Sequence, residues 1–139
     1  MRRRALLLAA GVALLPPARA TPEAMAAAIR SFTGGVPLHE GKVQLEVAPL
    51  VDNGNTVPVT ISVPGAPAAD VAALALFNER NLQSDVLRVD FGPRAATRTV
   101  ATRIRLATSQ QLVAVARLAD GSCWSQRVEV VVTLAACIE

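Results

Sequence analysis

Two cysteines are the side chains of this sequence best suited to covalent chemistry. Cys123 begins the run that leads into the last predicted strand, and Cys137 follows the end of that strand. An even number of cysteines in an exported protein usually indicates a disulfide. The two positions are fourteen residues apart, and an extended chain spans ~3.3 Å per residue, so the two thiols can bond only if the tail folds back. The sequence therefore leaves open a structural disulfide and a free thiol.

Cys137 lies on a short tail, because the chain continues from the last strand as Leu-Ala-Ala-Cys-Ile-Glu over residues 134–139. A thiol on such a stub is expected to be exposed and mobile. The charges on the tail are carboxylates and none is a cation that would favour the thiolate, so the thiol suits loading and unloading by other enzymes better than catalysis. We predict a covalent attachment site at Cys137 and no catalytic residue in this chain.

Metal and cofactor chemistry has little support in the sequence. His39 is the single histidine and lies in a connector that contains Pro37 and Gly41. A site built from His39 and the two thiols would match no known zinc-ligand spacing, so we interpret His39 as a surface or capping residue and predict no metal and no cofactor. The carboxylates show neither the paired spacing of glycosidases nor the spacing of a calcium loop.

Basic side chains are concentrated in one stretch that could attract an anionic compound or an acidic partner. The alternative is an ordinary solvated strand face, which charged residues commonly form. The side chains concerned are Arg94, Arg98, Arg103 and Arg105.

The first twenty residues have the composition of a secretory signal peptide. They hold four of the fourteen Lys and Arg and none of the eleven Asp and Glu, with an apolar run over residues 5–15 and the tripeptide Ala18-Arg19-Ala20. The apolar run is too short for a spanning helix, which needs ~20 residues. We predict a periplasmic protein without a membrane anchor, and the arginines at positions 2–4 also suit the twin-arginine export route. The remaining chain is nearly neutral, so no nucleic-acid partner is expected.

The elements that must position these side chains begin with a helix. Thr21 is a candidate N-cap, Pro22 suits the first helical position, and Gly34-Gly35 ends the segment, which predicts a short helix over residues 21–32. A connector follows up to residue 41. We interpret residues 21–41 as helix and connector, and interpret the Asp52-Asn53-Gly54 segment further on as a turn without chemistry.

From residue 42 onward, short apolar or alternating runs are separated by turn clusters, which is typical of a β-sandwich. We predict a mainly β fold: an immunoglobulin-like antiparallel β-sandwich of about seven strands over residues 42–134, with the short N-terminal helix before it and the tail at 135–139. The predicted strands are Val43–Pro49, Val57–Val63, Ala72–Phe77, Leu87–Phe91, Thr97–Leu106, Leu112–Leu118 and Ser125–Leu134.

The last two predicted strands are apolar on both faces, which indicates that their outer face is covered. Either the N-terminal helix or a partner subunit could supply the cover. On patterning alone, the outer positions Val113, Val115 and Val131 are candidates for a subunit interface.

Several segments together resemble the SoxY family, the sulfur-carrier subunits of periplasmic thiosulfate oxidation. The resemblance covers most of the chain after the signal peptide. It is carried by residues 46–63 with the segment Asn53-Gly54-Asn55-Thr56-Val57-Pro58, by Phe91-Gly92-Pro93-Arg94, by residues 102–107 and 112–116, by Asp120-Gly121-Ser122, by residues 130–134 and by Cys137.

The resemblance implies an immunoglobulin-like sandwich that forms a heterodimer with a SoxZ-like subunit and carries pathway intermediates on Cys137. A cytochrome would load thiosulfate, a hydrolase would release sulfate, and a sulfane dehydrogenase would oxidise the remaining sulfur. The usual family terminus is Gly-Gly-Cys-Gly-Gly, whereas this tail places Ala136 and Ile138 around the cysteine. The backbone of alanine is conformationally more restricted than that of glycine. A tail of this composition could therefore belong to a SoxY-like carrier that serves another periplasmic oxidation system. The remaining alternative is a disulfide-bonded structural or binding domain.

Overall fold

The computed structural model describes residues 21–137, and the predicted signal peptide lies outside that range. The chain begins with helix α1, Pro22–Thr33, as the capping pattern predicts. The Thr21 hydroxyl accepts a hydrogen bond from the Ala24 amide, and Gly34 ends the helix with a left-handed backbone. No helix within residues 21–137 is long and apolar enough to cross a membrane.

All seven predicted strands are present, and the structure adds two short ones. The strands are β1 (Leu38–Glu40), β2 (Gln44–Glu46), β3 (Leu50–Val51), β4 (Val57–Ser62), β5 (Val71–Asn78), β6 (Asp85–Asp90), β7 (Val100–Ile104), β8 (Gln110–Leu118) and β9 (Cys123–Val132). A single 3₁₀ turn, η1 (Ala68–Asp70), precedes β5. Strand β1 lies in the segment predicted as a connector, and β3 lies just before the predicted turn.

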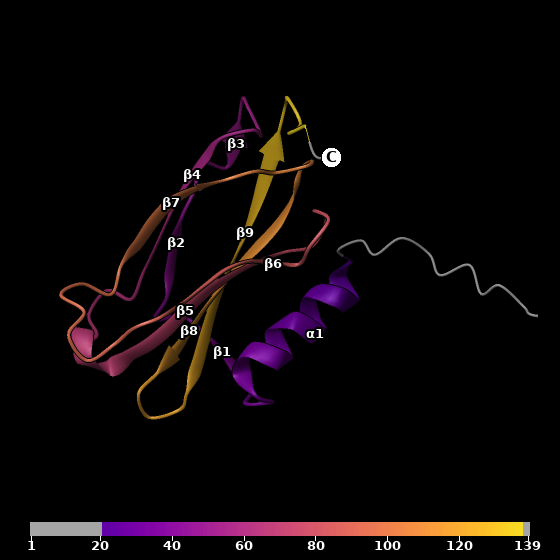
Figure 1. Cartoon of the computed structure of the whole chain (residues 1–139). Coiled ribbons are helices and arrows are strands. Elements are labelled where there is room, and N and C mark those ends of the chain that lie inside the picture. Colours follow the sequence, from indigo (N-terminus) through magenta and orange to yellow (C-terminus); the bar gives the residue numbers. More distant parts are fainter. Residues whose placement is uncertain (1–20, 138–139) are drawn as a thin grey trace, which may run out of the picture.

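The strands form two sheets that face each other as a sandwich (Figure 1). The larger sheet has the order β1-β9-β8-β5-β6, with β3 also paired to β9, and the smaller sheet has the order β2-β4-β7. The mainly β, sandwich class is therefore confirmed. The sheet is not antiparallel throughout, because β1 and β3 both run parallel to β9.

The region between the sheets holds the main core, and a second apolar cluster lies under α1. Ile61, Leu74 and Leu112 are fully buried in the main core. On the opposite face of the larger sheet, α1 contributes Ile29 and Phe32. Figure 1 shows α1 and the smaller sheet on opposite sides of the larger sheet. Strands β5 and β8 are therefore covered on both faces, which explains their two-sided apolar pattern.

This second cluster corrects one interpretation of the sequence. Val113 and Val115, predicted as subunit-interface candidates, are fully buried under α1 together with Ala75 and Phe77. The helix covers them because its own apolar stripe also needs burial, and Ile29 and Phe32 of that stripe pack into the same cluster. Val131 differs, because 53% of its surface is exposed.

Candidate functional site

Cys137 lies at the end of the sandwich where β9 finishes and the chain turns back across the neighbouring loops. Its side chain is exposed, as predicted, and its thiol is free, which the sequence left open. The backbone before it is held in place by hydrogen bonds. The Thr133 amide donates to the Val51 carbonyl at 3.0 Å, and the Ala136 amide donates to the Leu106 carbonyl at 3.0 Å. The predicted mobile stub is therefore a tail docked on the body of the protein.

The loop Asn53-Gly54-Asn55 receives the tail. The Gly54 amide donates to the Leu134 carbonyl at 2.7 Å, and the Gly54 carbonyl accepts from the Leu106 amide at 2.8 Å. The Cys137 amide donates to Oδ1 of Asn55 at 2.9 Å. This segment, interpreted from the sequence as a simple turn, thus bridges the end of β7 and the tail.

Asn55 is oriented for this contact by its neighbour in the loop. Oδ1 of Asn53 accepts two hydrogen bonds from Asn55, one from its backbone amide and one from Nδ2, both at 3.0 Å. Because Nδ2 is used in this way, Oδ1 of Asn55 is left to accept from Cys137. The two asparagines and the Cys137 amide therefore form one hydrogen-bonded chain.

Gly54 is required at its position by the closeness of three backbone segments. A Cβ atom on Gly54 would lie 2.5 Å from the Leu106 carbonyl oxygen, 2.9 Å from the Ala136 amide nitrogen and 3.0 Å from the Leu134 carbonyl oxygen. All three neighbours are backbone atoms, which cannot rotate out of the way. Only glycine lets the loop, the end of β7 and the tail approach one another this closely.

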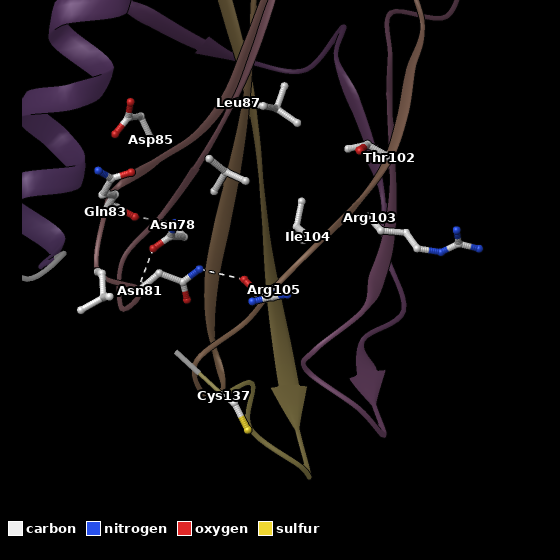
Figure 2. Close-up of a pocket in the computed structure, with 12 residues that line it drawn as sticks. Asn78, Asn81, Gln83, Asp85, Leu87, Thr102, Arg103, Ile104, Arg105 and Cys137 are labelled. Atoms are coloured by element: carbon white, nitrogen blue, oxygen red, sulfur yellow. Dashed lines mark hydrogen bonds between the residues drawn. The ribbon is translucent and has the colours of Figure 1, made fainter. Parts of the chain in front are cut away.

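A cavity of about 550 Å³ opens beside the tail, between the β5–β6 connection and β7. Cys137 lies at its rim, and Figure 2 shows its Sγ atom pointing away from the other labelled residues. The lining residues are Asn78, Asn81, Leu82, Gln83, Asp85, Val86, Leu87, Thr102, Arg103, Ile104 and Arg105.

A network of amide side chains makes the wall of this cavity rigid. Nδ2 of Asn81 donates to the Arg105 carbonyl at 2.8 Å, while its Oδ1 accepts from the Ala107 amide at 3.0 Å and from Gln110 at 2.8 Å. Asn78, which is buried, accepts from the Asn81 amide. These bonds hold the residues on both sides of Leu106, and Leu106 in turn receives the tail. Fully satisfied buried polar networks of this kind favour one conformation.

The four arginines singled out in the sequence do not form one face. Arg103 and Arg105 are exposed, line the cavity beside Cys137, and make no ion pair with any residue that the structure describes. Arg98 lies elsewhere: its guanidinium stacks on the Phe91 ring, with 5.2 Å between Cζ and the ring centroid, and donates to the carbonyls of Val71 and Gly92. Arg94 is exposed in the connection between β6 and β7 and does not line the cavity. Figure 2 shows the Arg103 guanidinium pointing away from Cys137, so the predicted basic face is not formed.

Cys123 has the opposite character to Cys137. It is fully buried where β9 begins, and burial raises the pKa of its thiol because desolvation disfavours the thiolate. Both cysteines are free in the structure. Strand β9 separates them by about 30 Å, at ~3.3 Å for each of its residues. The structure therefore does not contain the disulfide that the sequence left open.

This difference predicts selective alkylation. Iodoacetamide at neutral pH is expected to modify one thiol of the native protein, and peptide mass mapping should place the label on Cys137. In guanidinium chloride both cysteines should react, which provides the control for reagent and detection. Labelling of Cys123 in the native protein at a comparable rate would contradict the burial described above.

His39 does not approach the tail cysteine. It pairs in register with Trp124 across β1 and β9, and the two ring centroids are 5.2 Å apart. The Lys42 ammonium lies over the same indole at 4.2 Å. Within residues 21–137, no group of three His, Cys, Asp or Glu side chains is placed to hold a metal ion. His39 is exposed and takes part in an aromatic stack at the far end of β9.

The residues that position the tail were not identified from the sequence. Gly54, Asn55 and Leu106 lie far from Cys137 in the chain, and the contact between Asn55 and Cys137 joins residues 82 positions apart. The only signal available was the Asn-Gly-Asn segment itself, which turn chemistry explains equally well.

Comparison with known proteins assigns the sandwich and its tail to a described family. A family model described as sulfur oxidation protein SoxY matches residues 29–137. The structure of the sulfur carrier protein SoxY from Chlorobium limicola f thiosulfatophilum is similar, with a TM-score of 0.67 and 25% identity, covering 78% of this chain and 91% of that chain. No curated protein sequence matches significantly.

Superoxide reductases share the fold at lower identity. The E23A variant of the Ignicoccus hospitalis neelaredoxin is similar with a TM-score of 0.59 and 22% identity, covering 81% of this chain and 92% of that chain. A putative superoxide reductase from Thermotoga maritima has a TM-score of 0.56 and 16% identity, with 70% of this chain and 93% of that chain covered. At this level of identity, these likenesses show the fold alone.

Proposed function

The chain belongs to the SoxY family of sulfur oxidation proteins, and from this premise we propose that it is a non-catalytic carrier that holds sulfur intermediates covalently on Cys137. The observation that carries the proposal is the position of this thiol: it is free, exposed and at one end of the sandwich. The buried Cys123 offers no comparable site. A carrier needs one accessible nucleophilic atom, and Cys137 supplies it.

The loading reaction consistent with this site joins the outer sulfur of thiosulfate to Sγ of Cys137. A new S–S bond forms, the thiol proton is released, and two electrons pass to a cytochrome partner. Water then cleaves the bond between the sulfane sulfur and the sulfonate group, so that sulfate leaves and a persulfide stays on Cys137. A sulfane dehydrogenase would oxidise that remaining sulfur. This chain contributes the attachment atom, and its partner enzymes contribute the catalysis.

The family also supports a periplasmic location and a SoxZ-like partner for this chain. Of the three valines suggested by the sequence as interface residues, only Val131 is exposed. It pairs in register with Leu50, which is 57% exposed, across β3 and β9. This small apolar patch at the tail end of the sandwich is our candidate contact for the SoxZ-like subunit.

Mass spectrometry under non-reducing conditions tests the carrier function. The mature protein is exposed to thiosulfate with the loading enzymes present, and its intact and peptide masses are then measured. We expect a thiosulfonate or sulfane adduct on the peptide that contains Cys137 and none on Cys123. An adduct of another sulfur compound at Cys137 would point to a different periplasmic oxidation system. An unmodified Cys137, or a disulfide between Cys123 and Cys137, would contradict the proposal.

A further inference from the structure

The docked tail is held almost entirely by backbone hydrogen bonds and hardly by packing. The side chains of Leu134, Ala135 and Cys137 are exposed, and Ala136 is half-buried. Little apolar surface is therefore removed from water when the tail docks. What remains is a short series of hydrogen bonds from the tail to Val51, the Asp52 carbonyl, Gly54, Asn55 and Leu106, and each such bond contributes only modestly to stability. A tail held in this way can detach without unfolding the sandwich.

Asn55 accepts the hydrogen bond that lies nearest to the thiol, the one donated by the Cys137 amide. It is the only residue in the described chain that bonds the backbone of Cys137, and it does so with a side-chain oxygen. The Asn53 contacts fix the direction of that oxygen. Loss of the Asn55 side chain would release Cys137 while leaving the backbone bonds of Gly54 in place. The position of the thiol therefore depends on one amide group that does not take part in the core.

Docking limits how far the thiol can reach. The bond to Asn55 keeps Cys137 at the cavity rim, with its backbone beside the loop. When the segment Thr133–Cys137 detaches and extends, it reaches up to about 17 Å from the end of β9, at ~3.3 Å for each of its residues. An active site that encloses the thiol would need the extended arrangement, whereas a small reagent in solution would not.

We propose that Asn55 is a positioning residue that holds Cys137 against the end of the sandwich. Binding of the thiol in an enclosing active site then requires that the hydrogen bond between the Cys137 amide and Asn55 break first. The delivery of the thiol to such a site rests on the proposed carrier function. The positioning of Cys137 by Asn55 does not rest on the carrier function, because it concerns only the contacts between the tail and the loop at residues 53–55.

Amide hydrogen exchange measured by NMR on the whole mature chain tests the proposal without any sulfur chemistry. In the unaltered protein the amide of Cys137 should exchange more slowly than an unprotected amide, as should that of Ala136. In Asn55→Ala we expect exchange at Cys137 to become about five- to tenfold faster, in keeping with loss of one hydrogen bond. Asn55→Asp retains an acceptor oxygen for the Cys137 amide but turns a second oxygen toward Oδ1 of Asn53, so it should protect Cys137 less than asparagine does and more than alanine does. Asp52→Ala, an exposed neighbour whose side chain makes no described contact with the tail, is the matched control and should change nothing.

A nitroxide spin label on Cys137 supplies a second measurement. Its spectrum should sharpen in Asn55→Ala, because the backbone that carries the label gains motion, and should stay unchanged in Asp52→Ala. Full-rate exchange of the Cys137 amide in the unaltered protein, or equal protection in Asn55→Ala, would overturn the proposal. Either result would leave the adduct measurement, and with it the carrier function, unaffected. Conversely, protection of the Cys137 amide that depends on Asn55, without any sulfur adduct on Cys137, would contradict the carrier function alone.

Discussion

Cys137→Ser is expected to abolish covalent sulfur loading completely while leaving the fold intact. The variant lacks the only exposed sulfur atom in the described chain, since Cys123 is buried. The serine amide can still donate to Asn55, so the tail should dock as before. Exposed substitutions of this kind usually change the free energy of unfolding by less than about 0.5 kcal/mol. Intact mass after incubation with thiosulfate and the loading enzymes, together with a urea unfolding curve, measures both effects.

Cys123→Ser is the matched control for this experiment. It should load normally on Cys137, although placing a hydroxyl in a buried site is expected to lower stability. If the two cysteines formed a native disulfide, Cys137→Ser would instead lower the free energy of unfolding by about 2–5 kcal/mol. A stability loss of that size at Cys137, with no change in loading, would reject the carrier function in favour of a disulfide-bonded domain.

Gly54→Ala is expected to lower the free energy of unfolding by about 2–3 kcal/mol, because a new methyl group has no room among three backbone segments. Its Cβ would lie 2.5 Å from the Leu106 carbonyl oxygen and 2.9 Å from the Ala136 amide nitrogen. Either the loop moves away from the end of β7 or the tail detaches, and both outcomes break hydrogen bonds that the structure contains. Urea denaturation with an unchanged m-value would measure the loss of stability.

Gly92→Ala provides the comparison, because a Cβ on Gly92 meets no heavy atom within 4 Å. We expect Gly92→Ala to change the free energy of unfolding by no more than about 1 kcal/mol, in the stabilising direction because alanine lowers the conformational entropy of the unfolded chain. Equal effects of the two substitutions would show that Gly54 is not the point at which the loop, β7 and the tail meet.

The local elements of this protein could be predicted because their determinants are local. The helix follows from Thr21, Pro22 and the glycines that end it, and the structure places α1 there. Alternation over residues 57–63 predicted a strand with one buried face, and Val57, Val59 and Ile61 are indeed buried in β4. The exposure of Cys137 also follows from its place beyond the last strand. Capping, alternation and turn residues act over a few positions, so a linear reading captures them.

Pairing between distant segments could not be predicted in the same way. Strands β1 and β3 are only three and two residues long, and each forms by pairing parallel to β9. Their sequences carry no alternation long enough to indicate a strand. The element that covers Val113 and Val115 could not be predicted either. The apolar pattern indicated that both are buried, but either a helix or a partner subunit could have buried them.

The sequence by itself therefore determined the helix and the seven longer strands, which of their faces are apolar, and that one thiol lies on a tail beyond the last strand. Only the tertiary structure decided that this tail is docked, that Gly54 and Asn55 receive it, and that the tail does not fold back to join the two cysteines in a disulfide. The physical reason is the range of the interactions. Capping and periodicity are set by near neighbours, whereas docking of the tail depends on a hydrogen bond between residues 82 positions apart and on a backbone approach that only the folded sandwich creates.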